Sequence, residues 1–511
     1  MCNRPWLRLQ QKQSSRISRS HAVTQFFLDK MHSTCPAAGS TSSGSVLAVL
    51  AFLLPFGRMA FASSQTEVPG QQLDRQFQSA VAQYDAGKFA QAAALLEALL
   101  PKTPKSYEVH ELLGLVYAAE SQNDKAVGQL EAAVHLKPNS AEARTNLAAA
   151  LSHAGKPELA GDQLFKAHGA SSRDYEANHN LGEFYVQTGK VAQAQPLLEE
   201  AQRLQPTSYD NGYDLAQTDL LIGKLPEARL VVQRLILEKN TGELHNLLGQ
   251  IEEKDGKFVE AAKEFETAAR LDPSEDNLFA WGSELLLHRT YGPAIEVFQQ
   301  ATERYPSSPR LRIGLGMALY WRGKYEEAVR SLLAAADLDP SDARCYLFLA
   351  KAYDSSPNQA ADVIERFRRY AELQPSNGLA QYYYAMSLWK GKGAEEANPE
   401  HAQIESLLQK AVALDPKLAE AHLQLGILYT QGHESEKALP EYTQALQVDP
   451  KLADAHYRLA QYYVHVGQKS QASTEFDVYQ RLRAEHLAEV DKEATEVQQF
   501  VYSAKAAPPA K

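Results

Sequence analysis

The chain has 511 residues, of which 44% are hydrophobic and 23% are charged, proportions close to those of soluble globular proteins. Its three cysteines, Cys2, Cys35 and Cys345, are too few for a disulfide framework or a cysteine-rich zinc site. After residue 62 the chain carries 45 basic and 62 acidic side chains, a net charge of −17. Because phosphate backbones repel an acidic body of this kind, we do not expect nucleic acid as a partner.

The first 62 residues have the features of an export signal. Residues 46–56 form an apolar run that suits a signal peptide and is short for a membrane span. Basic residues precede this run, and Ala60-Phe61-Ala62 after it matches the small-x-small pattern that precedes a cleavage site. The sequence therefore predicts a presequence over residues 1–62, cleavage before Ser63, and a periplasmic or secreted protein.

Two features of this segment leave alternatives open. The basic part before the apolar run is long, which allows translation to begin at Met31 instead of Met1. Arg58 lies between the apolar run and the cleavage site. Residues 45–62 would span a membrane if the Arg58 side chain extended to the interface, and the protein would then be membrane-anchored by an uncleaved segment.

A short linker over residues 63–72 precedes a region with one dominant period. Prolines recur at intervals near 34 residues or near twice that length: Pro104, Pro138, Pro206, Pro273, Pro306, Pro340, Pro375, Pro416 and Pro450. Twelve repeats over residues 73–486 fit this spacing, with starts at Leu73, Tyr107, Ala141, Tyr175, Tyr209, Gly242, Glu275, Pro309, Ala343, Gly378, Ala419 and Ala453. A sequence repeat of this length indicates a solenoid of small helical units.

Each repeat has small residues at fixed positions. Position 8 is Gly or Ala in all twelve repeats: Ala80, Gly114, Ala148, Gly182, Ala216, Gly249, Gly282, Gly316, Ala350, Ala385, Gly426 and Ala460. Position 20 is Ala in most repeats, and position 24 carries a large apolar residue such as Leu130, Phe298 or Tyr442. A Gly-Lys pair recurs between these positions, where a glycine would end the first helix of the repeat with a positive φ.

In period and in these positions the chain resembles the tetratricopeptide-repeat (TPR) family, of a bacterial exported type. The resemblance implies an all-α fold, a right-handed TPR solenoid of about twelve helix–turn–helix repeats. Residues 487–503 continue a helical pattern and are expected to form a C-terminal capping helix, followed by a disordered tail over residues 504–511. Repeat nine has Ser355-Ser356-Pro357-Asn358 in place of the Gly-Lys turn, and extra residues within Gly391–Pro399 predict a loop in repeat ten.

The sequence contains no motif that indicates catalysis. Because the repeats occupy most of the chain, we expect no enzyme activity, no cofactor and no metal. His110-Glu111 lacks the second histidine of a zinc-protease helix, and no Gly-Lys-Ser/Thr phosphate loop occurs. Four histidines share position 4 of their repeats, where core packing is the expected role because zinc needs at least three protein ligands: His110, His245, His422 and His456.

The resemblance also implies that positions 2, 5, 9 and 12 of each repeat line a concave groove. Position 2 of repeats one to seven forms an acidic row: Asp74, Glu108, Glu142, Glu176, Asp210, Glu243 and Asp276. Acidic residues near a helix N-terminus are favoured by the helix dipole, so a structural role is expected for this row. Binding of a partner on the acidic side is the alternative.

Repeats seven to twelve place apolar residues at the groove positions instead. We call them the apolar row: Phe279, Leu286, Ile313, Met317, Tyr320, Leu347, Tyr382, Met386, Trp389, Leu423, Ile427 and Tyr457. The family stacks its repeats through other positions, so the row is predicted to be exposed and to bind partner proteins or peptides. The alternative is that neighbouring repeats cover part of it. Only Lys351 matches the clamp by which some TPR proteins hold C-terminal carboxylates, so such tails are not expected ligands.

The expected function is therefore a protein–protein interaction scaffold that binds partner proteins in the groove. Two alternatives differ from it in the partner. One is a membrane-anchored accessory subunit of an envelope glycan or secretion machine, and the other is a regulatory subunit of a separate enzyme.

Overall fold

A computed structural model of the protein describes residues 69–357, 359–392 and 401–485, and these ranges are helical without a β-strand. The chain divides into two compact units, Met1–Lys224 and Leu225–Lys511. The expected presequence (1–62), capping helix (487–503) and tail (504–511) lie outside the described residues.

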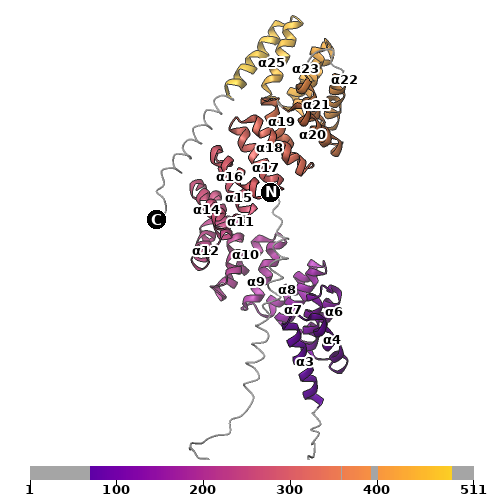
Figure 1. The fold of residues 1–511 in the computed structure, drawn as a ribbon, viewed down its shortest axis with the longest axis vertical. Helices are drawn as coiled ribbons and strands as arrows, with labels where there is room; N and C mark the ends of the chain where they lie inside the picture. Colours follow the sequence, from indigo (N-terminus) through magenta and orange to yellow (C-terminus); the bar gives the residue numbers. More distant parts are fainter. Residues whose placement is uncertain (1–68, 358, 393–400, 486–511) are drawn as a thin grey trace, which may run out of the picture. The chain divides into compact units, whose positions relative to one another are not determined.

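The first unit consists of helices in antiparallel pairs, drawn in indigo to magenta in Figure 1. The first helices of its repeats are α3 (Pro69–Asp85), α5 (Tyr107–Ala119), α7 (Ala141–His153), α9 (Tyr175–Gln187) and α11 (Tyr209–Ile222). The second helices are α4 (Phe89–Leu99), which continues into the 3₁₀ turn η1 (Leu100–Lys102), α6 (Asn123–Leu136), α8 (Pro157–Ala170) and α10 (Val191–Leu204).

The second unit begins with α12 (Leu225–Glu238) and continues the same alternation. Its first helices are α13 (Gly242–Lys254), α15 (Glu275–Leu287), α17 (Pro309–Trp321), α19 (Ala343–Ser355), α21 (Gly378–Lys392), α23 (Ala419–Gln431) and α25 (Ala453–His465). The second helices are α14 (Phe258–Leu271), α16 (Tyr291–Arg304), α18 (Tyr325–Leu338), α20 (Ala360–Leu373), α22 (His401–Leu414) and α24 (Ser435–Val448), and residues 469–485 are also helical.

The starts of the first helices agree with the repeat starts read from the sequence. Every repeat start after the first is the first residue of a helix. Many of these helices begin there because a capping residue precedes them. Ser140, for example, is extended and its hydroxyl accepts a hydrogen bond from the Ala143 amide at 3.1 Å, which satisfies one free N–H of the helix end. In the first repeat the helix starts earlier than position 1, Leu73: α3 begins at Pro69, within the expected linker, since proline is compatible with the first turn of a helix.

The small residues at position 8 are required by the large residues at position 24. A Cβ atom on Gly316 would lie 2.5 Å from Cγ of Leu332, and one on Gly114 would lie 2.5 Å from Cγ of Leu130. In both repeats the fully buried leucine of the second helix therefore rests directly on the backbone of the first. This contact fixes the spacing of the two helices, and any larger side chain at position 8 would push them apart.

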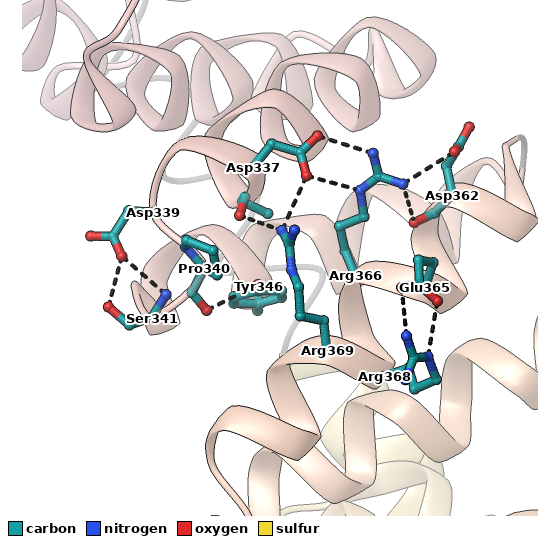
Figure 2. A network of polar contacts seen from close by, with 11 residues as sticks. Asp337, Asp339, Pro340, Ser341, Tyr346, Asp362, Glu365, Arg366, Arg368 and Arg369 are labelled. Atoms are coloured by element: carbon teal, nitrogen blue, oxygen red, sulfur yellow. Dashed lines mark hydrogen bonds and ion pairs between the residues drawn. The ribbon is translucent and has the colours of Figure 1, made fainter.

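Repeat nine departs from this pattern. Its position-8 residue, Ala350, is only half-buried, and the turn before α20 carries Gln359 in a left-handed conformation with φ of 59°. An ion-pair network holds α20 to α18 of the preceding repeat instead. Figure 2 shows Asp337 of α18 between Arg366 at 3.0 Å and Arg369 at 3.1 Å, both on α20. Arg369 also donates a hydrogen bond of 2.7 Å to the carbonyl oxygen of Ala336, near the negative end of the α18 dipole.

Repeat ten differs from its expected form at one end of the insertion. Gly391, expected in the loop, is part of α21, and the rest of the insertion over residues 393–400 lies outside the described residues. A Cβ atom on Gly391 would lie 2.7 Å from Ile364 of α20. The helix is therefore extended where it packs closely against repeat nine.

Candidate protein-binding surface

Successive first helices form a shared face in each unit. Neighbouring first helices contact each other from α3 to α11 in the first unit and from α13 to α21 in the second unit. Residues at the groove positions of neighbouring repeats are thereby brought close together. This first-helix face is the surface on which both predicted rows lie.

The structure places most of the apolar row at the edge of the core. Leu347 is 38% exposed. The other members that remain partly accessible are half-buried: Phe279, Leu286, Met317, Tyr320, Tyr382, Met386, Trp389, Ile427 and Tyr457. These residues combine core contact with an accessible edge.

Two members of the row were wrongly expected to be exposed. Ile313 is 5% exposed and Leu423 is 4% exposed, so both are part of the hydrophobic core. Each of the two packs in a hydrophobic core cluster with residues of the adjacent repeats, and this close packing covers the side chain. The accessible surface therefore consists of positions 9 and 12, with position 5 contributing in the other repeats.

Aromatic contacts divide the accessible row into groups. The Tyr320 ring lies 6.3 Å from Phe348 of the next repeat and 5.2 Å from Trp321. Tyr382 and Trp389 each pack against the hydrophobic core of repeats ten to twelve. Tyr457 lies 5.1 Å from Tyr479, on the helical segment over residues 469–485. These rings are fixed by their neighbours, which favours binding because few rotamers would be lost.

Charges on the same face are mostly paired. Arg310 forms ion pairs with Glu275 at 2.5 Å and Asp276 at 2.7 Å, and its guanidinium lies 5.1 Å from the centre of the Phe279 ring. Lys390 pairs with Asp354. The end of the acidic row is thus neutralised where the apolar row begins.

The acidic row of the first unit has partners of its own. Partial burial acts to raise the pKa of Glu108, but hydrogen bonds from its backbone and Ser106, with the nearby Lys137, lower it overall. Lys137 lies 3.1 Å from the Glu108 carboxylate. This acid therefore serves the first turn of α5 and the loop that follows the repeat, as the helix-dipole argument anticipates.

Glu111, at position 5 of repeat two, is a groove-side acid that the sequence analysis did not single out. Burial, with the charge of Glu142, raises its pKa to about 7, although hydrogen bonds from Tyr107 and Asn146 and the charge of Lys137 act in the other direction. The Tyr107 hydroxyl donates to Glu111 at 2.5 Å, and the Asn146 amide donates at 3.1 Å. An acid at groove position 5 of repeat two, next to the acidic row, was the available signal.

The four histidines at position 4 have a structural role, because each joins its helix to neighbouring segments by hydrogen bonds. His422 has one ring nitrogen 2.6 Å from Glu441 on the second helix and the other 3.3 Å from the carbonyl of Pro416 in the preceding turn. His456 repeats this arrangement with Glu475 at 2.5 Å and Pro450 at 3.1 Å. Within the described ranges, no cluster of three or more His, Cys, Asp or Glu is arranged to hold a metal ion. Position 4 thus ties the two helices of a repeat to the turn before it.

Among the helices that the structure describes, none is long and apolar enough to cross a bilayer.

The chain is similar to proteins built of the same repeat. Tetratricopeptide repeat models match residues 77–127, 115–176, 185–251 and 285–352, and a bacterial transcriptional activator domain model matches residues 365–501. The TPR repeat-containing protein YpiA of Bacillus subtilis (strain 168) is 26% identical over 190 residues, which are 36% of this chain and 42% of that protein. The small glutamine-rich tetratricopeptide repeat-containing protein 2 of Mycosarcoma maydis is 26% identical over 127 residues, which are 25% of this chain and 36% of that protein. The chain thus spans less than half the length of either relative.

Solved structures with similar repeats include the Cut9–Hcn1 hetero-tetramer of the APC/C, with 14% identity, a TM-score of 0.35 and coverage of 84% of this chain and 97% of that one. PilW, described as a type IV pilus biogenesis factor, has 23% identity, a TM-score of 0.36 and coverage of 40% and 96%. No matching family description names a catalytic activity. From its repeats, its helix pairs and the tetratricopeptide repeat models that match it, the chain belongs to the tetratricopeptide-repeat protein family.

Proposed function

We propose that the protein is an exported scaffold without catalytic activity that binds segments of partner proteins on the first-helix face of the second unit. The TPR repeats support an interaction scaffold in general. The observation that carries the more specific proposal is the apolar row, whose aromatic and methionine side chains remain half-exposed on successive first helices. Side chains of these types are enriched at binding hot spots.

The character of the face argues for a peptide or protein ligand. Aromatic rings fixed at intervals along neighbouring helices suit a chain that offers apolar side chains at similar intervals. The acidic balance of the whole chain disfavours nucleic acid. Ion pairs such as Arg310 with Asp276 reduce the net charge around the row, which favours contact with apolar groups.

Replacement of Leu347 by glutamate tests this proposal with little effect on the fold, because Leu347 is 38% exposed. The variant places a charge in the middle of the row and should lose most binding in pull-down experiments with the full chain. Phe165→Glu is a matched control, since Phe165 is 63% exposed on a second helix of the other unit. Equal recovery of partners by wild type and Leu347→Glu, with loss in the control, would place the binding surface elsewhere.

Export is part of the proposal and is supported by the apolar run 46–56 and the Ala60-Phe61-Ala62 pattern. Expression of the full chain in a Gram-negative host should give a protein outside the cytoplasm that begins at Ser63. N-terminal sequencing that finds residues 46–62 retained in a membrane fraction would support the anchored form instead.

A further inference from the structure

Two carboxylates and one imidazole lie together where the first helices of repeats six and seven meet. Glu253 is at position 12 of α13, Glu284 is on α15, and His288 directly follows α15. These helices contact each other. Glu284 is 4% exposed, and its Oε1 lies 3.4 Å from Nε2 of His288. Within the described part of the chain this oxygen accepts no hydrogen bond.

The cluster has an excess of negative charge. Burial, with the charge of Glu284, raises the pKa of Glu253, and His288 acts in the opposite direction. The cluster contains one imidazole and two carboxylates. The imidazole is itself held in place, because its ring centre lies 4.0 Å from that of Phe258.

Nearby basic residues are committed to other acids. Arg229 binds Glu252 at 2.6 Å and Asp255 at 2.6 Å. Lys257 binds Asp255 at 2.8 Å and approaches Glu252 at 3.7 Å. A buried carboxylate oxygen without a donor is costly, and a cationic N–H group is the strongest available partner for it.

The position of the cluster connects it to the apolar row. Glu253 is half-exposed, and its position 12 belongs to the same first-helix face as Phe279 and Leu286 of the next repeat. A ligand on the row would therefore pass Glu253 at the end of the row nearest repeat six. Glu284 lies in the neighbouring helix, beneath the surface.

We propose that Glu253 and Glu284 together accept an arginine or lysine side chain of the bound segment, which fixes the register and direction of that segment along the apolar row. This inference rests on the proposed function, since it names the partner as a segment with a basic residue at one end of a run of apolar residues. The acidic pair supplies specificity, and the aromatic side chains of the row supply most of the binding free energy.

Selection from a random peptide library displayed on phage, with the full chain as target, tests the inference. Enriched peptides should carry apolar or aromatic residues and a basic residue at a constant distance from them. The Glu253→Gln variant should retain the apolar preference, lose the basic preference, and bind a wild-type-selected peptide about tenfold more weakly. A higher salt concentration should weaken the binding of that peptide less for the variant than for wild type.

Glu266→Gln is the matched control, because Glu266 is a partly exposed acid on the second helix α14 and should leave both preferences unchanged. Peptides with apolar residues and no basic preference, or a basic preference that persists in Glu253→Gln, would overturn the inference and leave the proposed function standing. Failure to enrich any peptide, or enriched peptides that bind Leu347→Glu as well as wild type, would overturn both.

Discussion

The two units build the same scaffold and differ on the first-helix face. In the first unit this face carries acids such as Glu108, Glu111 and Glu142. In the second unit position 5 carries Tyr382 where repeat two has Glu111, and positions 9 and 12 carry Met317 and other members of the apolar row. The residues that join the two helices of each repeat are alike in both units.

This contrast separates the residues that make the fold from those free to vary. Gly114 in the first unit and Gly316 in the second have the same close contact with a leucine of the second helix. Positions 5, 9 and 12 have no such common requirement, so their composition is free to differ between the units. Side chains on the first-helix face can therefore differ while the helix contacts stay constant, as expected of repeats that contact only their neighbours.

The largest expected effect tests whether the scaffold is the same in both units. Gly114→Leu and Gly316→Leu should each lower the free energy of unfolding by about 2 to 3 kcal/mol, because the new side chain overlaps a buried leucine. Local loosening by hydrogen exchange should be confined to the mutated repeat and its neighbours. Gly128→Leu is the control, since a Cβ atom on Gly128 would meet nothing within 4 Å. A large loss of stability for one glycine variant and none for the other would show that the two units do not share the same helix contact.

The second prediction asks which unit binds. Trp389→Ala and Tyr382→Ala should each weaken partner binding by about 2 kcal/mol, as loss of an aromatic anchor does. Glu142→Gln and Glu176→Gln in the acidic row should change it little. Because Trp389 and Tyr382 also pack against the core, thermal unfolding must be measured beside the binding assay. Normal binding by the aromatic variants with weak binding by the acidic-row variants would move the site to the first unit.

Much of the fold was available from the sequence because its signals repeat. Capping residues such as Ser140 and close contacts such as Gly316 with Leu332 recur at a fixed spacing, so each repeat supports the assignment of the next. The places where the structure differs from the predicted fold have local causes, which the spacing of the repeats does not reveal. Ile313 is buried because it packs in a core cluster with residues of neighbouring helices, and α20 is held by Arg366 and Arg369 in a repeat whose turn is irregular.

Less of the candidate site could be predicted from the sequence. Positions on a helix face follow from spacing, but the depth of a side chain depends on how closely its neighbouring helices pack. Glu284 illustrates this limit: on the sequence it is one acid in a helical repeat, and the structure buries it beside His288. The binding role of the apolar row is still a prediction.

The third prediction uses the pH dependence of the first unit. The pKa of Glu111 is raised from 4.5 to about 7, so the folded state favours the protonated acid. This contribution to stability is fully present below about pH 4.5 and is lost as the pH rises through 7. Glu111→Gln keeps the neutral form at all pH values and should be more stable than wild type at pH 8 by about 1 to 2 kcal/mol. Urea unfolding at acidic and alkaline pH measures the difference.

Glu131→Gln is the control for this measurement, because Glu131 is exposed on the second helix α6. It should follow the wild-type pH dependence. A Glu111→Gln variant that loses stability equally at both pH values would show that the carboxylate is needed in its charged form. The acidic face of the first unit would then be a set of satisfied charges, and its contrast with the second unit would be weaker.

The smallest expected effect concerns repeat nine, the irregular part of the second unit. Asp337→Asn removes the charge that joins α18 to Arg366 and Arg369 of α20, whereas Asp362→Asn removes a charge that pairs with Arg366 within α20 alone. Because these side chains are partly exposed, Asp337→Asn should cost only about 0.5 to 1 kcal/mol, and Asp362→Asn less. The cost should shrink at high salt, which screens such pairs. Hydrogen exchange should locate the loosening in α20, where the position-8 contact of the regular repeats is weak. If both variants behave alike, the network does not connect the two repeats, and repeat nine must be held by its aromatic core, in which the Tyr346 and Tyr370 rings stack at 4.0 Å.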